Sequence, residues 1–236
     1  MIYITVGSAL GTGVILAVCM SACQREELYS LRRNEEGERN PDLKWWIFLS
    51  IVHVVIVFGW SSLLYNIGVI RLYENYDTFG KGILFFFGYW VIFELWYWIS
   101  HRLQHMIPCC GILTGHKGEL TKKYHHGMTA PYGPDYLTAF SAHPVDSFIV
   151  QLAAQSPWII CYVIGTITGT FLEISFFTYG ITIAWLVYID MRAHTRNSYG
   201  GYFHCKHHDD PSGGPYSFSG IPEGVLSQVE GFFHKC

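Results

Sequence analysis

"ILFFFGYWVIFELWYWISHRLQH", residues 83–105, decides the fold class of this chain. The 18 residues from Ile83 to Ser100 carry one charged side chain, Glu94, and two histidines follow within five residues. An apolar run of this length matches the ~20 residues that a helix needs to cross the hydrocarbon core of a bilayer. The stretch therefore predicts a membrane-spanning helix whose last turns carry histidines.

Two further apolar runs lie before this stretch. Residues 2–23 provide 22 positions without a charge, and residues 45–70 provide 26. No lysine or arginine precedes the first run, which favours a retained helix over a cleaved signal peptide. Both runs are predicted to form membrane-spanning helices.

A fourth apolar region lies between Asp146 and Asp190, where Glu173 is the only charge among 43 residues. One helix of that length would be about twice as long as the bilayer is thick. The region therefore predicts two spans, or one span and a re-entrant piece, with a turn near residues 165–170. Together the runs predict an all-α, polytopic membrane protein with about four to five transmembrane or re-entrant helices, in a single domain over residues 1–236.

Composition and charge support this class. Half of the 236 residues are apolar, 17% are aromatic and only 14% are charged, which is unusual for a soluble domain. The net charge of −3 provides no basic surface for nucleic acid. Of the 15 lysines and arginines, all except Arg71 and Lys81 fall on the side of the histidines, which predicts that this side faces the cytosol. The seven scattered cysteines are interpreted as reduced, which agrees with a cytosolic site.

Ten of the twelve histidines lie between residues 101 and 208, and chance placement explains this poorly. His101 and His105 are four residues apart, so on a helix they share one face and can reach one metal region. Glu94 lies two turns earlier on the same face. A carboxylate in a membrane helix is costly, and its natural partner is the N–H of a ligand histidine. The alternative is an ion pair or hydrogen bond with another helix.

Two more histidine groups follow. "HKGELTKKYHHG" (116–127) places His116 ahead of the pair His125 and His126, and "YFHCKHHDD" (202–210) contains a full His-x-x-His-His triplet, His204, His207 and His208. A zinc site that uses Cys205 is possible, but it leaves most histidines unused, so two metal ions are favoured. Imidazole ligands suit iron, copper or zinc, and the absence of Glu-x-x-His argues against a carboxylate-bridged helical bundle. Beneath apolar helices, iron with O2 is the favoured choice, with a lipid C–H bond as the target.

In these motifs the sequence resembles the fatty acid hydroxylase / sterol desaturase superfamily of integral membrane di-iron enzymes. Glu94, His101 and His105, with "YW" at 97–98, match its first motif. "HHGMTAPYG" (125–133), "AFSAHPVD" (139–146) with His143, and the triplet at 204–208 match the following ones. His194 resembles the additional histidine upstream of the last motif. The resemblance is strongest over residues 90–235.

The chain departs from the superfamily pattern in its second motif. Removal of "GELTKK" (118–123) leaves "HKYHH", the usual form. His116 also lies near the usual distance after His105, whereas Lys122 occupies the position of the expected first ligand. We therefore interpret 118–123 as an insertion and His116 as the ligand. The superfamily's Asn-Tyr-Gly is represented by "PYS" (215–217), and the usual Trp-Asp is missing from the tail, so an inactive member is the alternative.

The resemblance implies an O2-dependent lipid hydroxylase or desaturase with two iron ions in a cytosolic, histidine-rich catalytic cap. It implies a sterol or fatty acyl substrate, with a sterol as first choice, an external electron donor of the cytochrome b5 type, and a location in the endoplasmic reticulum membrane with the active site facing the cytosol. Glu94 is expected to orient a ligand rather than bind metal. The metal ligands implied are His101, His105, His116, His125, His126, His143, His194, His204, His207 and His208. The alternative function is an inactive or metal-binding membrane protein that retains the fold.

Overall fold

The computed structural model describes residues 1–23, 43–117, 139–194, 207 and 216–217. These residues form helices apart from one pair of very short strands and the connecting turns, which agrees with the predicted class. In chain order the elements are α1 (Ile2–Cys23), α2 (Leu43–Asn66), β1 (Leu72–Tyr73), α3 (Phe79–Met106), α4 (Pro108–Thr114), α6 (Pro144–Thr168), β2 (Ile174–Ser175) and α7 (Phe176–Ala193).

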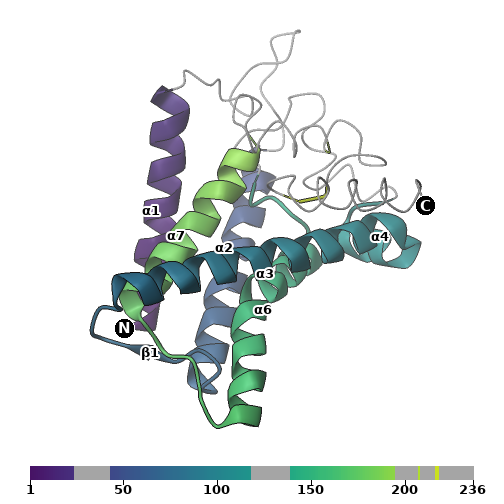
Figure 1. The fold of residues 1–236 in the computed structure, drawn as a ribbon. Coiled ribbons are helices and arrows are strands. Elements are labelled where there is room, and N and C mark those ends of the chain that lie inside the picture. Colours follow the sequence, from purple (N-terminus) through teal and green to yellow (C-terminus); the bar gives the residue numbers. More distant parts are fainter. Residues whose placement is uncertain (24–42, 118–138, 195–206, 208–215, 218–236) are drawn as a thin grey trace, which may run out of the picture.

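Helix α3 crosses the other long helices, which run roughly side by side (Figure 1). Helix α1 packs along α7 in the same direction, and α6 packs against both α2 and α3. The connections after α2 and α6 meet in the parallel pair of β1 and β2, with Leu72 opposite Ile174. Helix α3 leads away from this end of the molecule and brings the chain to α4.

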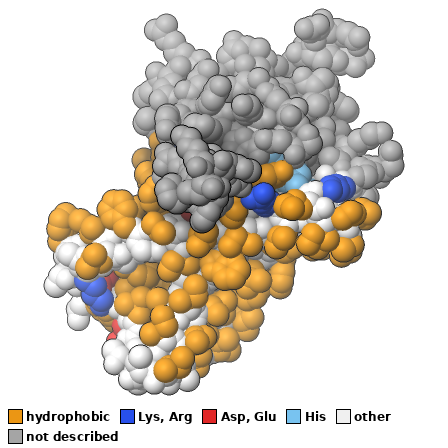
Figure 2. Space-filling view, turned by 45° about the vertical axis from the view of Figure 1, so that its right-hand side comes forward, with side chains coloured by type: hydrophobic (Ala, Val, Ile, Leu, Met, Phe, Trp, Pro, Cys, Tyr) orange, Lys and Arg blue, Asp and Glu red, His pale blue; other side chains and the backbone are white. Residues whose placement is uncertain are grey.

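Four of the described helices are long and apolar enough to cross a membrane. Their outer surfaces carry many exposed large hydrophobic side chains, which cover most of the described face in Figure 2. Apolar surface of this extent is typical of proteins that contact lipid or a partner. The segments are Ile2–Cys19, Ile47–Asn66, Phe79–Met106 and Pro144–Thr168.

The fourth apolar region contains two helices, as predicted, and of these only α6 is among the four candidate membrane spans. Helix α6 ends at Thr168, and Gly169 closes it in the left-handed conformation with φ of 75°, which glycine adopts without steric cost. The chain then passes through β2 into α7. The region between Asp146 and Asp190 therefore forms two helices, and the turn begins at Gly169, within the expected residues 165–170.

Small residues bring α1 close to α7. The buried residues Ile2, Val6, Ala9 and Ala17 lie on one helix face, with Gly13 between the last two. A Cβ added to Gly13 would lie 2.6 Å from the carbonyl oxygen of Ala184. Close approach through small residues is a common way for membrane helices to associate.

A buried carboxylate, Asp77, joins the start of α3 to the start of α7. Its side chain is 2% exposed and lies 3.1 Å from Lys81 Nζ. Oδ2 accepts hydrogen bonds from the Ser175 backbone N–H at 2.8 Å and from the Thr178 hydroxyl at 2.5 Å. The Tyr73 hydroxyl donates to Oδ1.

We expect Asp77→Asn to lower the melting temperature of the detergent-solubilised protein by on the order of 5 °C at pH 7. Burial alone would raise the pKa of Asp77, but hydrogen bonds from Thr178, Tyr73 and Ser175 outweigh burial and hold the pKa well below its ordinary range. The folded protein therefore binds this proton less readily than the unfolded chain. The stabilisation of the folded protein by ionised Asp77 is present above about pH 4 and is lost as the pH falls below this value.

The control is Glu74→Gln, which removes a nearby exposed carboxylate. Melting curves measured between pH 3 and 8, values chosen to bracket the ~3.9 of an ordinary Asp, should show a weaker acid dependence for Asp77→Asn alone. Equal melting curves for the two variants would contradict a structural role for Asp77.

Candidate metal centre

The first two site residues lie on one face of α3, near its end. Glu94, His101 and His105 belong to the buried face of this helix, as the spacing predicts. The Nε2 atoms of His101 and His105 are 3.3 Å apart. Helix α3 thus carries the pair on a rigid element rather than on a loop.

A sharp turn brings His116 back to this pair. Helix α3 stops at Ile107, Pro108 begins α4, and Gly115 ends α4 in the left-handed conformation with φ of 76°. The His116 backbone N–H then bonds to the Gly111 carbonyl at 2.8 Å. A Cβ on Gly111 would lie 2.6 Å from the carbonyl oxygen of Gln104, so a glycine there lets α4 fold closely against α3.

Three buried histidines converge as a result. The ring centroid of His116 lies 4.8 Å from that of His105 and 5.3 Å from that of His101. One ligand atom from each of the three rings lies within 4.8 Å of the others. This is the only group of potential metal ligands found among the residues that the structure describes.

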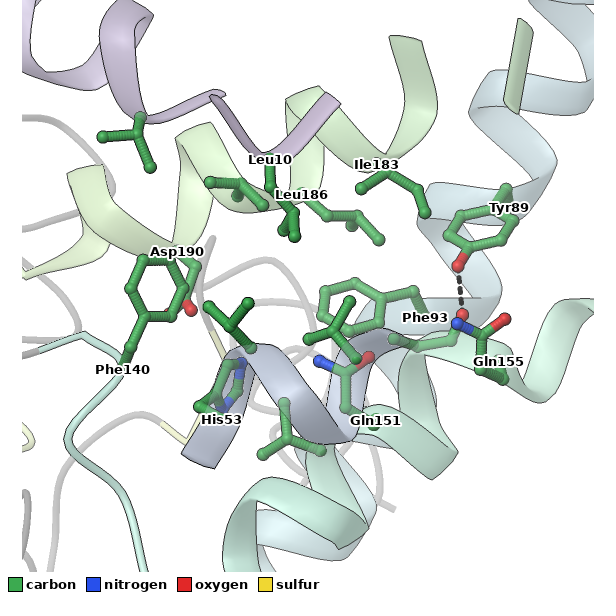
Figure 3. A pocket seen from close by; sticks show the side chains of 16 residues that line it. Leu10, His53, Tyr89, Phe93, Phe140, Gln151, Gln155, Ile183, Leu186 and Asp190 are labelled. Atoms are coloured by element: carbon green, nitrogen blue, oxygen red, sulfur yellow. Dashed lines mark hydrogen bonds between the residues drawn. The ribbon is translucent and has the colours of Figure 1, made fainter. Parts of the chain in front are cut away.

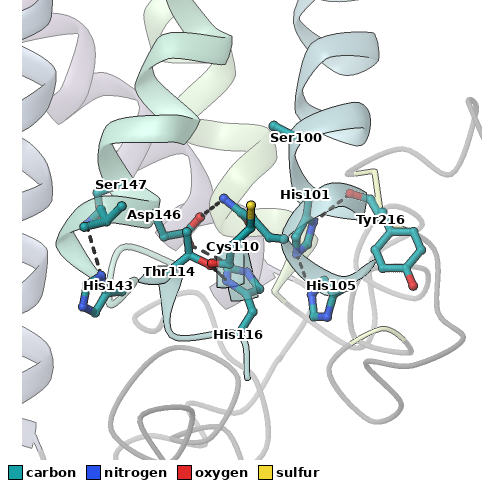
Figure 4. Close-up of polar contacts among 12 residues, drawn as sticks. Ser100, His101, His105, Cys110, Thr114, His116, His143, Asp146, Ser147 and Tyr216 are labelled. Atoms are coloured by element: carbon teal, nitrogen blue, oxygen red, sulfur yellow. Dashed lines mark hydrogen bonds and ion pairs between the residues drawn. The ribbon is translucent and has the colours of Figure 1, made fainter. Parts of the chain in front are cut away.

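Residues from the far end of the chain complete the cluster. The His207 ring is fully buried, with its centroid 4.7 Å from His101 and 4.6 Å from His105. The ring centroid of Tyr216 lies 5.2 Å from that of His207 and 5.4 Å from that of His105. Figure 4 shows His101, His105, His116 and Tyr216 gathered below α3 and α6.

Hydrogen bonds determine which nitrogen of two of these histidines can bind a metal. His101 Nδ1 lies 2.9 Å from the Tyr216 carbonyl oxygen, which can only accept, so Nδ1 carries the hydrogen and Nε2 has the lone pair. The Thr114 hydroxyl lies 2.8 Å from the Cys110 carbonyl and 2.9 Å from His116 Nδ1. Both contacts form together only when the hydroxyl donates to Cys110 and accepts from His116 Nδ1–H. Each histidine therefore presents its Nε2 lone pair.

Burial also keeps His116 in the form that binds metals. It lowers the pKa of His116 to about 4, against an opposing contribution from the hydrogen bond with Thr114. The imidazole is consequently neutral at pH 7, and a neutral imidazole is required for coordination. Several buried imidazoles form a donor set that suits iron, copper or zinc.

No family model matches the chain, and no curated protein or solved structure matches it. The resemblance to the di-iron superfamily therefore depends on the sequence motifs.

A buried carboxylate that the motif analysis did not assign to the site lies beside His116. Asp146 Oδ1 accepts a hydrogen bond of 2.9 Å from Gln104 Nε2, and Oδ2 lies 3.9 Å from His116 Nε2. Asp146 stands in the first turn of α6. An acidic residue at the start of a long apolar helix is the sequence signal that could have identified it. Thr114, which holds His116, had no such signal.

The other described residues of the predicted site lie outside the group of three histidines. His143 precedes α6, where its Nδ1 accepts a hydrogen bond of 3.2 Å from the Val145 backbone N–H. His194 ends α7, and its Nδ1 lies 2.7 Å from the Asp190 carbonyl oxygen. Ligand roles for His143 and His194 stay predictions.

The orienting role of Glu94 also stays a prediction. Glu94 is buried on the expected face of α3, while the Nδ1–H of His101 donates to Tyr216. The remaining predicted ligands and the proposed insertion lie outside the described residues. They are His125, His126, His204, His208 and residues 118–123.

Proposed function

We propose that this chain is an O2-dependent lipid hydroxylase or desaturase that uses two histidine-bound iron ions. The convergence of His101, His105 and His116 within 4.8 Å supports the proposal most directly. The inclusion of His207, a member of the third histidine motif, adds further support. When bound, iron would supply the oxidising chemistry that side chains lack.

The protein's part in this proposal is to hold and orient the ligands. His101, His105, His116 and His207 would bind metal together with predicted ligands from the other motifs. The Tyr216 carbonyl and the Thr114 hydroxyl fix the rings of His101 and His116. Burial of the cluster keeps bulk water from the ligands, which strengthens the electrostatic interactions inside the site.

A lipid substrate is proposed because apolar helices carry the histidine cluster, and an apolar cavity lies among these helices. The cavity has a volume of about 90 Å³ and lies between α1, α2, α3, α6 and α7 (Figure 3). One of its polar wall residues, His53, lies 3.0 Å from the Ser147 hydroxyl through Nδ1. Ser147 is adjacent to Asp146, so one turn of α6 separates the cavity from the histidines. The cavity is smaller than the roughly 300–1,000 Å³ typical of ligand pockets, so the proposal of a lipid substrate depends on the apolar helices.

The finer parts of the proposal follow the motifs and the charge distribution. The substrate is a sterol or fatty acyl lipid, and the electrons come from an external donor of the cytochrome b5 type. The protein is placed in the endoplasmic reticulum membrane, with the histidine cluster facing the cytosol because 13 of its 15 lysines and arginines fall on that side.

Metal content and lipid products together test this function. The full chain, purified anaerobically with iron, should hold two iron ions, and cells with the gene should contain an oxygenated or desaturated lipid that is absent from cells without it. Two bound metals without any lipid change would favour the inactive, metal-binding alternative. One tightly bound zinc that His207→Ala leaves in place would contradict the di-iron centre.

A further inference from the structure

We propose that Asp146 supplies an oxygen ligand to the metal ion at His116, so that the centre combines imidazole and carboxylate donors. This inference depends on the proposed metal centre and extends its ligand set. A carboxylate ligand would change the relative affinities of the site for different metal ions from those expected for histidine ligands alone.

The fold holds the Asp146 carboxylate beside His116. Helix α6 begins at Pro144 and packs against both α3 and α4, which places the first turn of α6 beside His116. The facing side chains of His116 and Asp146 are only 3% and 7% exposed. Figure 4 shows Asp146 between α6 and the turn that carries His116.

The Nε2 atom of His116 lies near the Asp146 carboxylate. The Thr114 hydroxyl takes the Nδ1 hydrogen of His116, so Nε2 of the neutral ring has a lone pair and no hydrogen. Asp146 Oδ2 is also an acceptor and lies 3.9 Å from Nε2. A cation between them is attracted by both atoms, in a buried setting where such attraction is strong.

The distance between the two atoms fits a shared metal ion. Two ligands that each lie ~2.0–2.2 Å from one ion are at most about 4.4 Å apart. The 3.9 Å between Asp146 Oδ2 and His116 Nε2 is within this limit. Gln104 Nε2 holds the other oxygen, Oδ1, at 2.9 Å. The carboxylate is thus oriented with one oxygen toward His116, as outer hydrogen bonds commonly orient metal ligands.

A carboxylate ligand has a chemical consequence that can be measured. Oxygen donors suit harder ions such as Mn²⁺, whereas imidazole donors alone serve Co²⁺ and Zn²⁺ well. Loss of the carboxylate charge should therefore weaken Mn²⁺ binding more than Co²⁺ binding. A residue that only positions His116 would affect both ions alike.

The test compares Asp146→Asn with the unaltered full chain in detergent. The asparagine carbonyl can still accept the Gln104 hydrogen bond, so the substitution removes the charge and retains the shape. We expect Mn²⁺ affinity to fall by more than about 100-fold, beyond the range typical of lost outer partners, and Co²⁺ affinity to fall less. Electron paramagnetic resonance of Mn²⁺ and visible spectra of Co²⁺ give the two affinities.

Ser147→Ala is the matched control, because Ser147 is the next residue on α6, is buried, and bonds to His53. It should leave both affinities unchanged, and melting curves without metal should show that Asp146→Asn is folded. Unchanged affinities in Asp146→Asn, or equal losses for the two ions, would overturn the ligand role while the metal centre stands. If the unaltered chain binds neither ion, the proposed function fails with it.

Discussion

The variant His101→Ala is expected to bind less metal at the proposed centre than the unaltered chain. The His101 ring lies close to the three other described histidines of the cluster, with centroid distances of 5.0 Å to His105, 5.3 Å to His116 and 4.7 Å to His207. Loss of a ligand in this position should reduce metal affinity by more than the roughly 10- to 100-fold typical of a lost outer partner. Elemental analysis of the anaerobically purified variant should show the loss of at least one of the two proposed metals.

His53→Ala provides the matched control for this variant. His53 is also a buried helical histidine with a hydrogen-bond partner, Ser147, and the sequence motifs give it no metal role. Its variant should keep the full metal content even where its melting temperature falls. Equal metal loss in the two variants would show that unfolding, rather than loss of a ligand, empties the site.

Gly13→Leu is expected to separate α1 from α7. A Cβ at this position would already lie 2.6 Å from the Ala184 carbonyl oxygen and 2.7 Å from Val187 Cβ, and leucine adds three more carbons. Overpacking of this kind costs about 1–3 kcal/mol or more. We expect a lower melting temperature and a smaller monodisperse fraction when the detergent-solubilised variant is analysed by size-exclusion chromatography.

The corresponding control is Gly11→Leu, two residues away on the same helix. A Cβ at Gly11 has no atom within 4 Å, so the substitution adds the same side chain and improves helix propensity without a clash. Its melting temperature should equal or exceed that of the unaltered protein. If both leucine variants behave alike, close packing of α1 on α7 does not hold the fold together.

The sequence predicted which segments form helices better than it predicted the residues at which these helices begin and end. The stretch from Ile83 to His105 indicated one helix with histidines in its last turns, and α3 runs from Phe79 to Met106. Thr78 caps its start through the Lys81 backbone N–H, and Pro108 follows its end. Polar residues such as Gln104 continue the helix while facing the site, so hydropathy alone could not show where it ends.

Local spacing predicted the shared face of His101 and His105, and the motifs named His116 and His207, but neither predicted the contacts of Tyr216 and Asp146 with the site. His101 and His105 are one helical turn apart, so their shared face follows from the sequence. The contact of His101 with Tyr216 joins residues 115 positions apart, and that of Gln104 with Asp146 joins residues 42 apart. Such contacts depend on how α3, α4 and α6 fold together, which no motif spacing records.

Helix α3 connects the hydrogen bonds of Asp77 at its start to the histidine pair near its end. Asp77 fastens one end of this helix to α7, while His101 stands 22 residues after its first residue, Phe79, or about 33 Å along the axis. A change in the tilt of α3 at its start would therefore displace the histidines near its end. A tilt of about 2° at the fastened end moves His101 by about 1 Å, which exceeds the ~0.5 Å within which a site must be held. Small changes around Asp77 are thus expected to shift the candidate metal ligands His101 and His105 without contacting them.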